Sequence, residues 1–126
     1  MNRYVGPQPL RVATWVDHER GVVEVAGEVD VYTTPELRAA VAEVQEKAQR
    51  PHLVVLLGEL TFCDSSGLGV LVGAHKRAVM AGGRVALVGT RENLLRILRV
   101  TGLAKLLPTF EGTDAAFTWL DSWAGR

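Results

Sequence analysis

The feature that most constrains the fold is a short stretch in which every residue is apolar. Residues 53–57 read LVVLL, so a strand formed by them would have no polar side chain on either of its two faces. A strand of this kind is typical of the centre of a largely parallel sheet, because layers of other elements then cover both of its faces. The stretch therefore predicts a layered α/β fold built around this strand.

The flanking sequence supplies the other elements of such a fold. Residues 10–17 and 23–29 alternate around a turn at 17–21, which predicts a hairpin. Thr33 and Glu36 have the spacing of a capping box, and the following helix is expected to end before Pro51. Its expected apolar stripe is Leu37, Ala40, Val41, Val44 and Ala48, with Glu43 and Lys47 paired on the wet face.

The second half repeats the alternation of helix and strand. A helix is expected from about residue 65, with Leu68, Leu71, Val72, Ala78 and Val79 able to face the core. Residues 84–88 predict a strand after the Gly82-Gly83 turn. A short helix around residues 94–98 should end near Gly102. Residues 106–110 and 113–123 predict a last short strand and a final helix, where Trp119 and Trp123 are expected to cover the sheet.

Composition narrows the class of protein. The chain has 126 residues with 48% hydrophobic and 22% charged residues, as expected for one globular domain. Its apolar runs are too short for a membrane span, and no signal-peptide pattern is seen, which favours the cytoplasm. The single Cys63 cannot form an internal disulfide. The net charge is zero and no nucleic-acid-binding module is recognisable, although seven bases and one acid fall within residues 76–105.

Polar residues gather at the start of the predicted helix that follows the LVVLL strand. Asp64, Ser65 and Ser66 come directly before Gly67, Gly69 and Gly73, which is the stretch DSSGLGVLVG. One serine would suffice as a cap, and a glycine inside a helix costs about 1 kcal/mol relative to alanine. The stretch therefore needs an explanation other than helix stability.

Three kinds of chemistry fit this stretch poorly. A hydrolase elbow needs glycine two residues before the nucleophile, but Cys63 and Asp64 occupy those places. His75 is about 13 Å along the same helix, and His52 begins the preceding strand at the opposite end of the sheet. The glycine spacing matches neither a dinucleotide nor a phosphate loop, and the scattered His residues lack metal-ligand spacing. We therefore expect no enzyme activity, no cofactor and no metal.

Recognition of a protein partner fits better. A hydroxyl at a helix N-terminus lies near exposed amides, where the helix dipole favours an added phosphate. Ser66, Gly69, Gly73 and Lys76 or Arg77 fall on one face of the helix, which would be nearly bare of side chains up to its basic end. The alternative, that Gly69 and Gly73 allow tight packing inside the domain, remains open at this point.

The motif DSSGLG at residues 64–69 after an apolar strand resembles the phosphorylation motif of bacterial anti-sigma-factor antagonists, which consist of a STAS domain. Two more segments support the resemblance: GEVD at 27–30 followed by residues 33–38, and RVTGL at 99–103. The similarity covers roughly residues 12–117. It implies a STAS-like mixed β-sheet of four or five strands with helices packed mainly on one face. Residues 1–126 would be a single STAS domain with its core at about 10–123.

The resemblance also implies a function. The unphosphorylated antagonist binds an anti-sigma factor, which then releases its sigma factor. The anti-sigma factor is commonly a serine kinase that phosphorylates the antagonist, and a PP2C-type phosphatase reverses this. Ser65 takes the place of the family's phosphoacceptor. The residues expected to contact the partner are Asp30, Thr33, Asp64, Ser65, Ser66, Gly67, Gly69, Gly73 and Lys76. The alternative is a STAS scaffold or regulatory subunit of a signalling or transporter complex without sigma-factor control.

Overall fold

The computed structural model describes residues 9–123 and opens with a hairpin. Strands β1 (Leu10–Asp17) and β2 (Arg20–Val29) pair antiparallel, as their alternating patterns predict. The two residues between them, His18 and Glu19, have φ values of 50° and 72°. Positive φ at both turn positions is the geometry whose twist matches that of the flanking strands.

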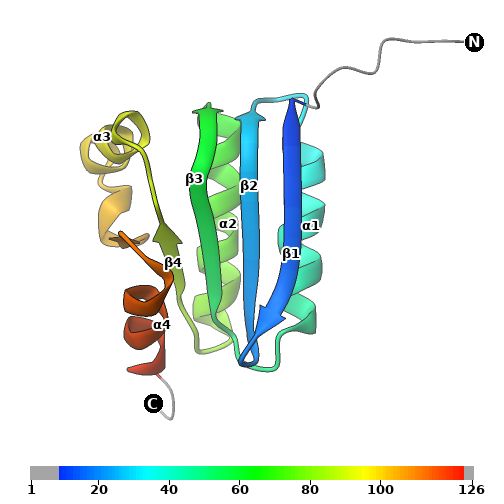
Figure 1. The fold of residues 1–126 in the computed structure, drawn as a ribbon, viewed down its shortest axis with the longest axis vertical. Coiled ribbons are helices and arrows are strands. Elements are labelled where there is room, and N and C mark those ends of the chain that lie inside the picture. Colours follow the sequence, from blue (N-terminus) through cyan, green and yellow to red (C-terminus); the bar gives the residue numbers. More distant parts are fainter. Residues whose placement is uncertain (1–8, 124–126) are drawn as a thin grey trace, which may run out of the picture.

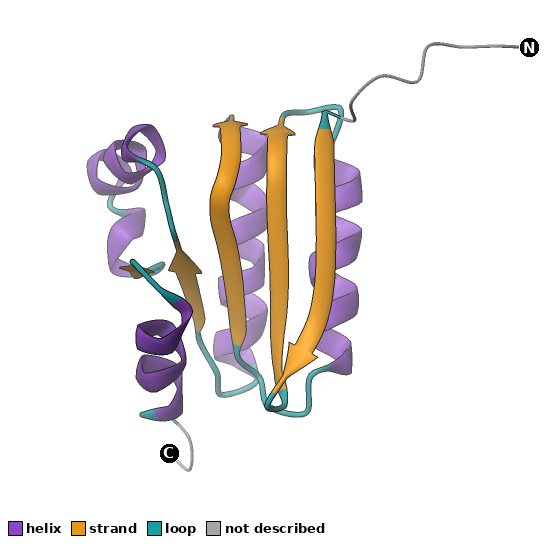
Figure 2. Ribbon diagram, viewed as in Figure 1, coloured by secondary structure: helices purple, strands orange, loops and turns teal. Residues whose placement is uncertain are grey.

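The remaining strands are parallel to β2 and complete a five-stranded mixed sheet. They are β3 (Leu53–Cys63), β4 (Val85–Val88) and β5 (Thr109–Phe110), and the spatial order follows the sequence, β1-β2-β3-β4-β5 (Figure 1). Helices α1 (Thr34–Lys47) and α2 (Ser65–Met80) make the crossovers from β2 to β3 and from β3 to β4. The chain then continues through α3 (Glu92–Thr101), the 3₁₀ turn η1 (Leu103–Lys105) and α4 (Thr113–Asp121) (Figure 2). The predicted mixed sheet is confirmed.

The helices are divided unequally between the two faces of the sheet. Helices α1 and α2 lie side by side behind β1, β2 and β3 in Figure 1, and with α3 they bury the larger core cluster. Helix α4 lies on the other face and covers a smaller cluster. That cluster consists of Val22, Val54, Ala86, Val88, Ala116 and Leu120. The prediction that helices pack mainly on one face is therefore confirmed.

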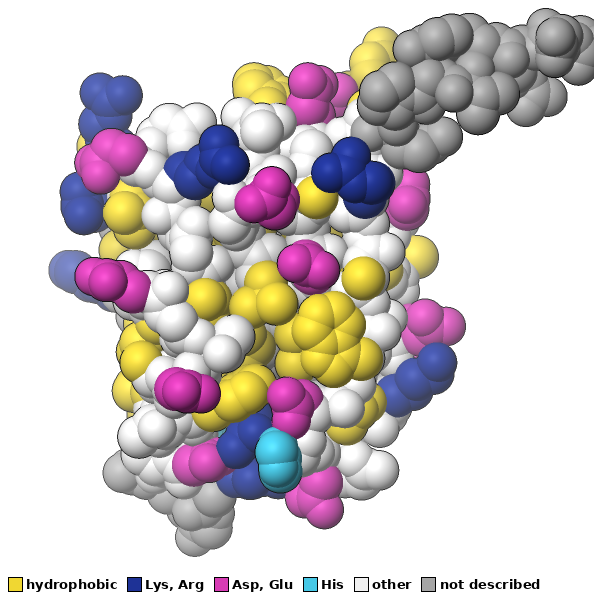
Figure 3. Space-filling view, in the orientation of Figure 1, with side chains coloured by type: hydrophobic (Ala, Val, Ile, Leu, Met, Phe, Trp, Pro, Cys, Tyr) yellow, Lys and Arg dark blue, Asp and Glu magenta, His cyan; other side chains and the backbone are white. Residues whose placement is uncertain are grey.

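Part of the second face stays open to solvent because α4 is short. Trp15 on β1 is 40% exposed there, although residues of its type usually lie mostly buried. Figure 3 shows apolar side chains in the middle of this face with charged side chains around them. Trp119 extends the cover of α4 by packing on Phe110 with ring centroids 5.7 Å apart. Trp123 packs under the guanidinium of Arg84 at 4.0 Å.

Two details of the helices differ from the sequence predictions. The capping box at Thr33 is not formed, because its hydroxyl turns back to donate to the Glu28 carbonyl instead of capping α1. In α2 the predicted Leu71 and Ala78 are buried and Leu68 packs on the core, but Val79 is 39% exposed, and the buried stripe also includes Val70 and Ala74. The small Ala74 was not counted as a core residue, yet it is fully buried, and its carbonyl accepts a hydrogen bond from Gln45 of α1.

The end of α2 is formed by Gly82, as the glycine pair predicts. Gly82 has φ of 92°, and its amide donates to the Val79 carbonyl while the Gly83 amide donates to Ala78. This pair of bonds is a Schellman motif, which satisfies the last carbonyls of the helix. The chain then turns directly into β4.

Candidate functional site

The polar residues of the DSS motif lie where the carboxyl ends of β2 and β3 meet. These strands are parallel, so the helices that follow them, α1 and α2, begin at the same edge of the sheet. The Asp64 amide donates to the Val29 carbonyl at 3.1 Å, which fixes the start of α2 beside the end of β2. Figure 1 shows this edge at the top of the molecule.

Asp64 is the N-cap of α2. Its Oδ1 accepts from the amides of Ser66 at 2.9 Å and Gly67 at 3.3 Å, which satisfies donors that have no partner inside the helix. The pKa of Asp64 is lowered, first by the hydrogen bond from the Ser66 hydroxyl and then by the backbone amides. Asp64 is therefore a charged carboxylate at neutral pH.

Ser66 is held in place by two neighbours. Its hydroxyl donates to Asp64 Oδ1 at 2.5 Å, so in the 2.7 Å hydrogen bond between Ser66 and Thr34 the Thr34 hydroxyl is the donor. Thr34 is buried in the first turn of α1, and the Asp30 carbonyl is a second acceptor within reach of its single hydroxyl proton. Ser66 thus joins the first turns of α1 and α2.

Ser65 has the opposite surroundings. It is the first residue of α2, it is exposed, and its hydroxyl has no hydrogen-bond partner among residues 9–123. The free hydroxyl stands at the positive end of the helix dipole. The two adjacent serines are therefore distinct: one is accessible, and the other is a structural bridge.

The loop between β2 and α1 lies against this site. The Asp30 carboxylate accepts from the amides of Tyr32 and Thr33 at 2.9 and 3.0 Å, and the Asp30 amide donates to the Thr33 hydroxyl. Asp30 and Thr33 thereby fix the shape of the loop. That shape projects Val31 and Tyr32 outward, 64% and 88% exposed.

Phe62, near the end of β3, adds a third exposed apolar side chain, which is 49% exposed. Sequence reasoning passed over Val31, Tyr32 and Phe62. The only signal in the sequence was the presence of two large side chains, Val31 and Tyr32, in a loop between a strand and a helix.

The glycines of α2 fall into two groups. A Cβ on Gly67 would lie 2.5 Å from Cys63 Sγ and 2.7 Å from Val29 Cγ1, so this glycine permits close packing on the sheet. A Cβ on Gly69 would meet nothing within 4 Å, and one on Gly73 would meet only Arg77 Nη1 at 3.8 Å.

Gly67 was predicted to contact a partner, but it is buried within the domain and is therefore not part of the exposed surface of α2. The geometry of Gly69 and Gly73 removes the internal-packing explanation for those two. Together with the exposed Lys76, they leave one face of α2 bare up to its basic end.

Two histidines lie at the opposite edge of the sheet from this site, and the third, His75, lies further along α2. His52 directly precedes β3 and is buried at the opposite edge of the sheet, as predicted. His18 lies in the hairpin turn beside Asp17, at that same edge. Within the described residues, no group of three or more His, Cys, Asp or Glu side chains could hold a metal ion. Across the same residues, no helix has both the length and the hydropathy to cross a membrane.

Comparison with known proteins identifies the family of this chain. The STAS domain family matches residues 12–116. An anti-sigma F factor antagonist of Paenibacillus polymyxa is 35% identical over 108 residues, covering 84% of this chain and 92% of the relative. An anti-sigma-B factor antagonist of Bacillus subtilis is 38% identical over 85 residues, covering 68% and 76%.

A crystal structure of an anti-sigma factor antagonist from Mycobacterium paratuberculosis superposes with a TM-score of 0.80. It has 27% identity and covers 93% of this chain and 98% of that one. This chain belongs to the STAS domain family, and its relatives there include anti-sigma factor antagonists. The resemblance seen in the sequence is confirmed.

Proposed function

We propose that this protein is an anti-sigma-factor antagonist whose binding is switched off by phosphorylation of Ser65. The observation that carries the proposal is the difference between the two serines. Ser65 offers a free hydroxyl on the surface, whereas the Ser66 hydroxyl is engaged by Asp64 and Thr34. A kinase can approach the first serine without disturbing the fold, and phosphorylation of the second would break the bridge between two helices.

The switch works through charge. A phosphoserine adds about −1.5 to −2 charge. The N-terminus of α2 tolerates that charge because its amides and dipole favour anions. A partner surface that buries the phosphate without a matching cation would have to desolvate it beside the charged Asp64, which costs several kcal/mol. Phosphorylation therefore leaves the fold intact and weakens the complex.

The partner surface in this proposal surrounds Ser65 on both sides. The bare face of α2, formed by Gly69, Gly73 and Lys76, lets a partner approach the helix backbone closely. Val31, Tyr32 and Phe62 supply apolar area at the same edge of the sheet. Exposed aromatic side chains at the centre of an interface commonly supply much of its binding energy. Asp30 and Thr33 contribute by holding the loop that carries two of these side chains.

The rest of the reaction cycle belongs to other proteins. The anti-sigma factor itself acts as the serine kinase, a PP2C-type phosphatase removes the phosphate, and this chain catalyses neither step. Because sigma factors act on RNA polymerase, the proposal requires a cytoplasmic protein. Ester hydrolysis by this chain that disappears in Ser65→Ala would argue against the non-enzymatic role.

The proposal is tested by affinity capture from a lysate of the source cells. The parent, Ser65→Ala and Ser66→Ala proteins are each used as bait with and without added ATP, and captured proteins are identified by mass spectrometry. We expect the parent to capture an anti-sigma factor with a serine-kinase domain, and to lose it when ATP is present. Ser65→Ala should retain it in both conditions.

Phosphopeptide mapping of the ATP-treated bait then assigns the modified residue. The expected phosphate is on Ser65. Phosphate on Ser66 alone would overturn the assignment of the switch, and capture of a transporter or scaffold assembly in place of an anti-sigma factor would overturn the function.

A further inference from the structure

The bases that the sequence concentrates in residues 76–105 do not all have the same surroundings. Arg84 packs its guanidinium group on the Trp123 ring, 4.0 Å from the ring centroid. Arg91 Nε donates to the Gly58 carbonyl at 2.9 Å. These two guanidinium groups are therefore engaged by other parts of the domain.

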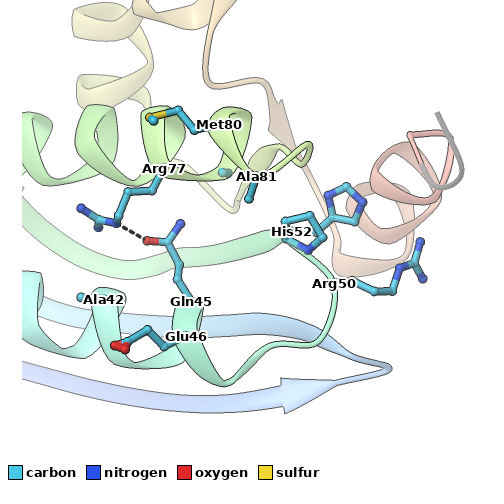
Figure 4. A pocket seen from close by; sticks show the side chains of 10 residues that line it. Ala42, Gln45, Glu46, Arg50, His52, Arg77, Met80 and Ala81 are labelled. Atoms are coloured by element: carbon cyan, nitrogen blue, oxygen red, sulfur yellow. Dashed lines mark hydrogen bonds between the residues drawn. The ribbon is translucent and has the colours of Figure 1, made fainter.

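A third base, Arg77, lies near the C-terminal end of α2, at the edge of the sheet opposite Ser65. Its Nε donates to Gln45 of α1 at 2.9 Å, beside a groove between the C-terminal ends of the two helices (Figure 4). Arg50 and His52 also line this groove. Arg77 is thus remote from the proposed switch.

The bases on α3 and η1 are exposed and largely unpaired. The side chains of Arg96 and Lys105 have no hydrogen-bond or ion-pair partner among residues 9–123. Arg99 Nη1 lies 3.7 Å from Glu92, but both side chains are exposed, and such a pair holds its charges weakly. Residues 91–105 carry four bases and one acid, so this surface is positive. Figure 3 shows Lys and Arg side chains along the side of the molecule that α3 forms.

The position of α3 joins this positive surface to the edge that carries Ser65. Strand β4 is parallel to β3, so α3, which follows β4, begins at the same edge of the sheet as α2. Phe62 at the end of β3 and Ile97 of α3 line the same small cavity. Phe62 is one of the exposed side chains of the proposed partner surface. A partner that covers Phe62 therefore also faces α3.

We propose that the anti-sigma factor presents an acidic surface to α3, and that Arg96, Arg99 and Lys105 attract it. This inference rests on the proposed function and specifies the chemistry of the partner. Bases gathered beside a binding surface steer a partner of opposite charge during diffusional encounter, which raises the association rate.

An acidic partner surface also accounts for the direction of the proposed switch. A phosphate on Ser65 adds about −1.5 to −2 charge beside Asp64, at the edge that the same partner covers. The partner then meets a like charge and offers no cation to match it. Attraction by α3 and repulsion by the phosphate thus act on one and the same partner surface.

The association rate of the purified anti-sigma factor with the unphosphorylated full chain tests this inference. Stopped-flow fluorescence measures the rate constant at about 50 mM and about 500 mM NaCl, and we expect it to fall as salt screens the attraction. Arg96→Glu/Arg99→Glu should lower it at least about tenfold at the lower salt. Val100→Ala, which keeps the charge of α3, should leave it unchanged.

A second double variant controls for net charge. Arg11→Glu/Lys47→Glu changes the net charge by the same amount, but on β1 and α1, at the far end of the sheet from α3 (Figure 1). All four side chains are exposed, so both double variants should fold. The control should stay within about twofold of the parent at the lower salt.

An equal fall for both double variants, an unchanged rate for Arg96→Glu/Arg99→Glu, or a parent rate that is independent of salt would each overturn the proposal. These outcomes are distinct from a failure of the proposed function. If the parent captures no anti-sigma factor, the function itself is wrong and this inference falls with it. If a captured factor associates without regard to Arg96 and Arg99, only this inference is wrong.

Discussion

At the scale of single residues, the N-terminus of α2 contains three neighbouring polar residues with different roles, Asp64, Ser65 and Ser66. Asp64 caps α2, Ser66 ties that cap to α1 through Thr34, and Ser65 carries no structural bond from its hydroxyl. A side chain that supports nothing can be modified without loss of the fold. The accessible hydroxyl is therefore the one suited to a reversible switch.

The different surroundings of the two serines predict unequal effects of substituting them. Ser66→Ala should lower the free energy of unfolding by about 1 to 2 kcal/mol, because Asp64 and Thr34 each lose a hydrogen-bond partner. Ser65→Ala should change it by less than about 0.5 kcal/mol, as for other exposed sites. Urea denaturation of the two variants beside the parent measures both. Equal losses for both serines would contradict these different roles.

The Asp64 carboxylate predicts a dependence of stability on pH. Its pKa is lowered in the folded state by the hydrogen bonds it accepts, so its charged form stabilises the fold above the unfolded pKa of about 3.9. That stabilisation is lost as the pH falls from about 4 through the folded pKa. The free energy of unfolding of the parent should therefore exceed that of Asp64→Asn at pH 7, and the difference should shrink below pH 4.

Asp121 also has a lowered pKa, mainly through Arg20, and contributes to acid unfolding in the same range. Asp121 is present in both the parent and the Asp64→Asn protein, so the difference between their free energies of unfolding reports on Asp64 alone. A difference that stays constant from pH 7 to pH 3 would show that the charge of Asp64 has no such role.

At the scale of elements, α2 uses its glycines for two purposes. Gly67 lets the first turn pack on β2 and β3, whereas Gly69 and Gly73 lie over open space. An added methyl group must displace Cys63 and Val29 at the first position and meets only solvent or Arg77 at the others. The same residue type thus supports the core on one side of the helix and shapes the surface on the other.

Alanine substitution separates these two purposes by the sign of its effect. Gly67→Ala should destabilise the protein by about 1 to 3 kcal/mol through overpacking. Gly69→Ala should stabilise it by up to about 1 kcal/mol, because alanine is the better helix former and has room. Thermal denaturation of both variants provides the measurement. A stable Gly67→Ala protein would mean that the close packing seen there is not needed.

A bulky side chain on the bare face should act on binding and not on folding. Gly73→Leu is expected to leave the melting temperature near that of the parent and to raise the Kd for the anti-sigma factor, since a leucine would hold the partner away from the helix. Val100→Ala, on α3 away from this face, is the matched exposed control. An unchanged Kd for folded Gly73→Leu would remove α2 from the interface.

The sequence predicted the type and order of the elements because their periodicities are local. It placed the β3 strand at residues 53–57, but the strand continues to Cys63. The pairing of β3 with β2 is irregular around Gly58 and Glu59, and the strand continues beyond this irregularity. Gly58 and Glu59 are exposed, so polar residues are tolerated in this part of the strand.

The roles of the two serines could not be read from the chain alone. The partner that distinguishes Ser66, Thr34, belongs to another helix 32 residues earlier. Tertiary contacts of this kind leave no local pattern. The resemblance of the DSSGLG motif pointed to Ser65, but the residues alone did not show that Ser66 is bound to another helix.

At the scale of the whole molecule, the sheet separates two edges with different properties. One edge carries Ser65, the bare face of α2 and the exposed Tyr32, and the other carries the groove with Arg50 and His52. Helices α1 and α2 run the full distance between them and are joined at both ends, by Ser66 with Thr34 and by Arg77 with Gln45. The open sheet face with Trp15 lies outside both edges.

The central claim is that one phosphate on Ser65 breaks the complex with the anti-sigma factor. The most direct measurement is the Kd of the purified anti-sigma factor for the parent protein before and after stoichiometric phosphorylation, by isothermal titration calorimetry at fixed salt. Burial of the phosphate at the interface predicts a Kd at least about a hundredfold higher for the phosphorylated form, on the order of 3 kcal/mol. A phosphorylated protein that binds as tightly as the parent would contradict the account.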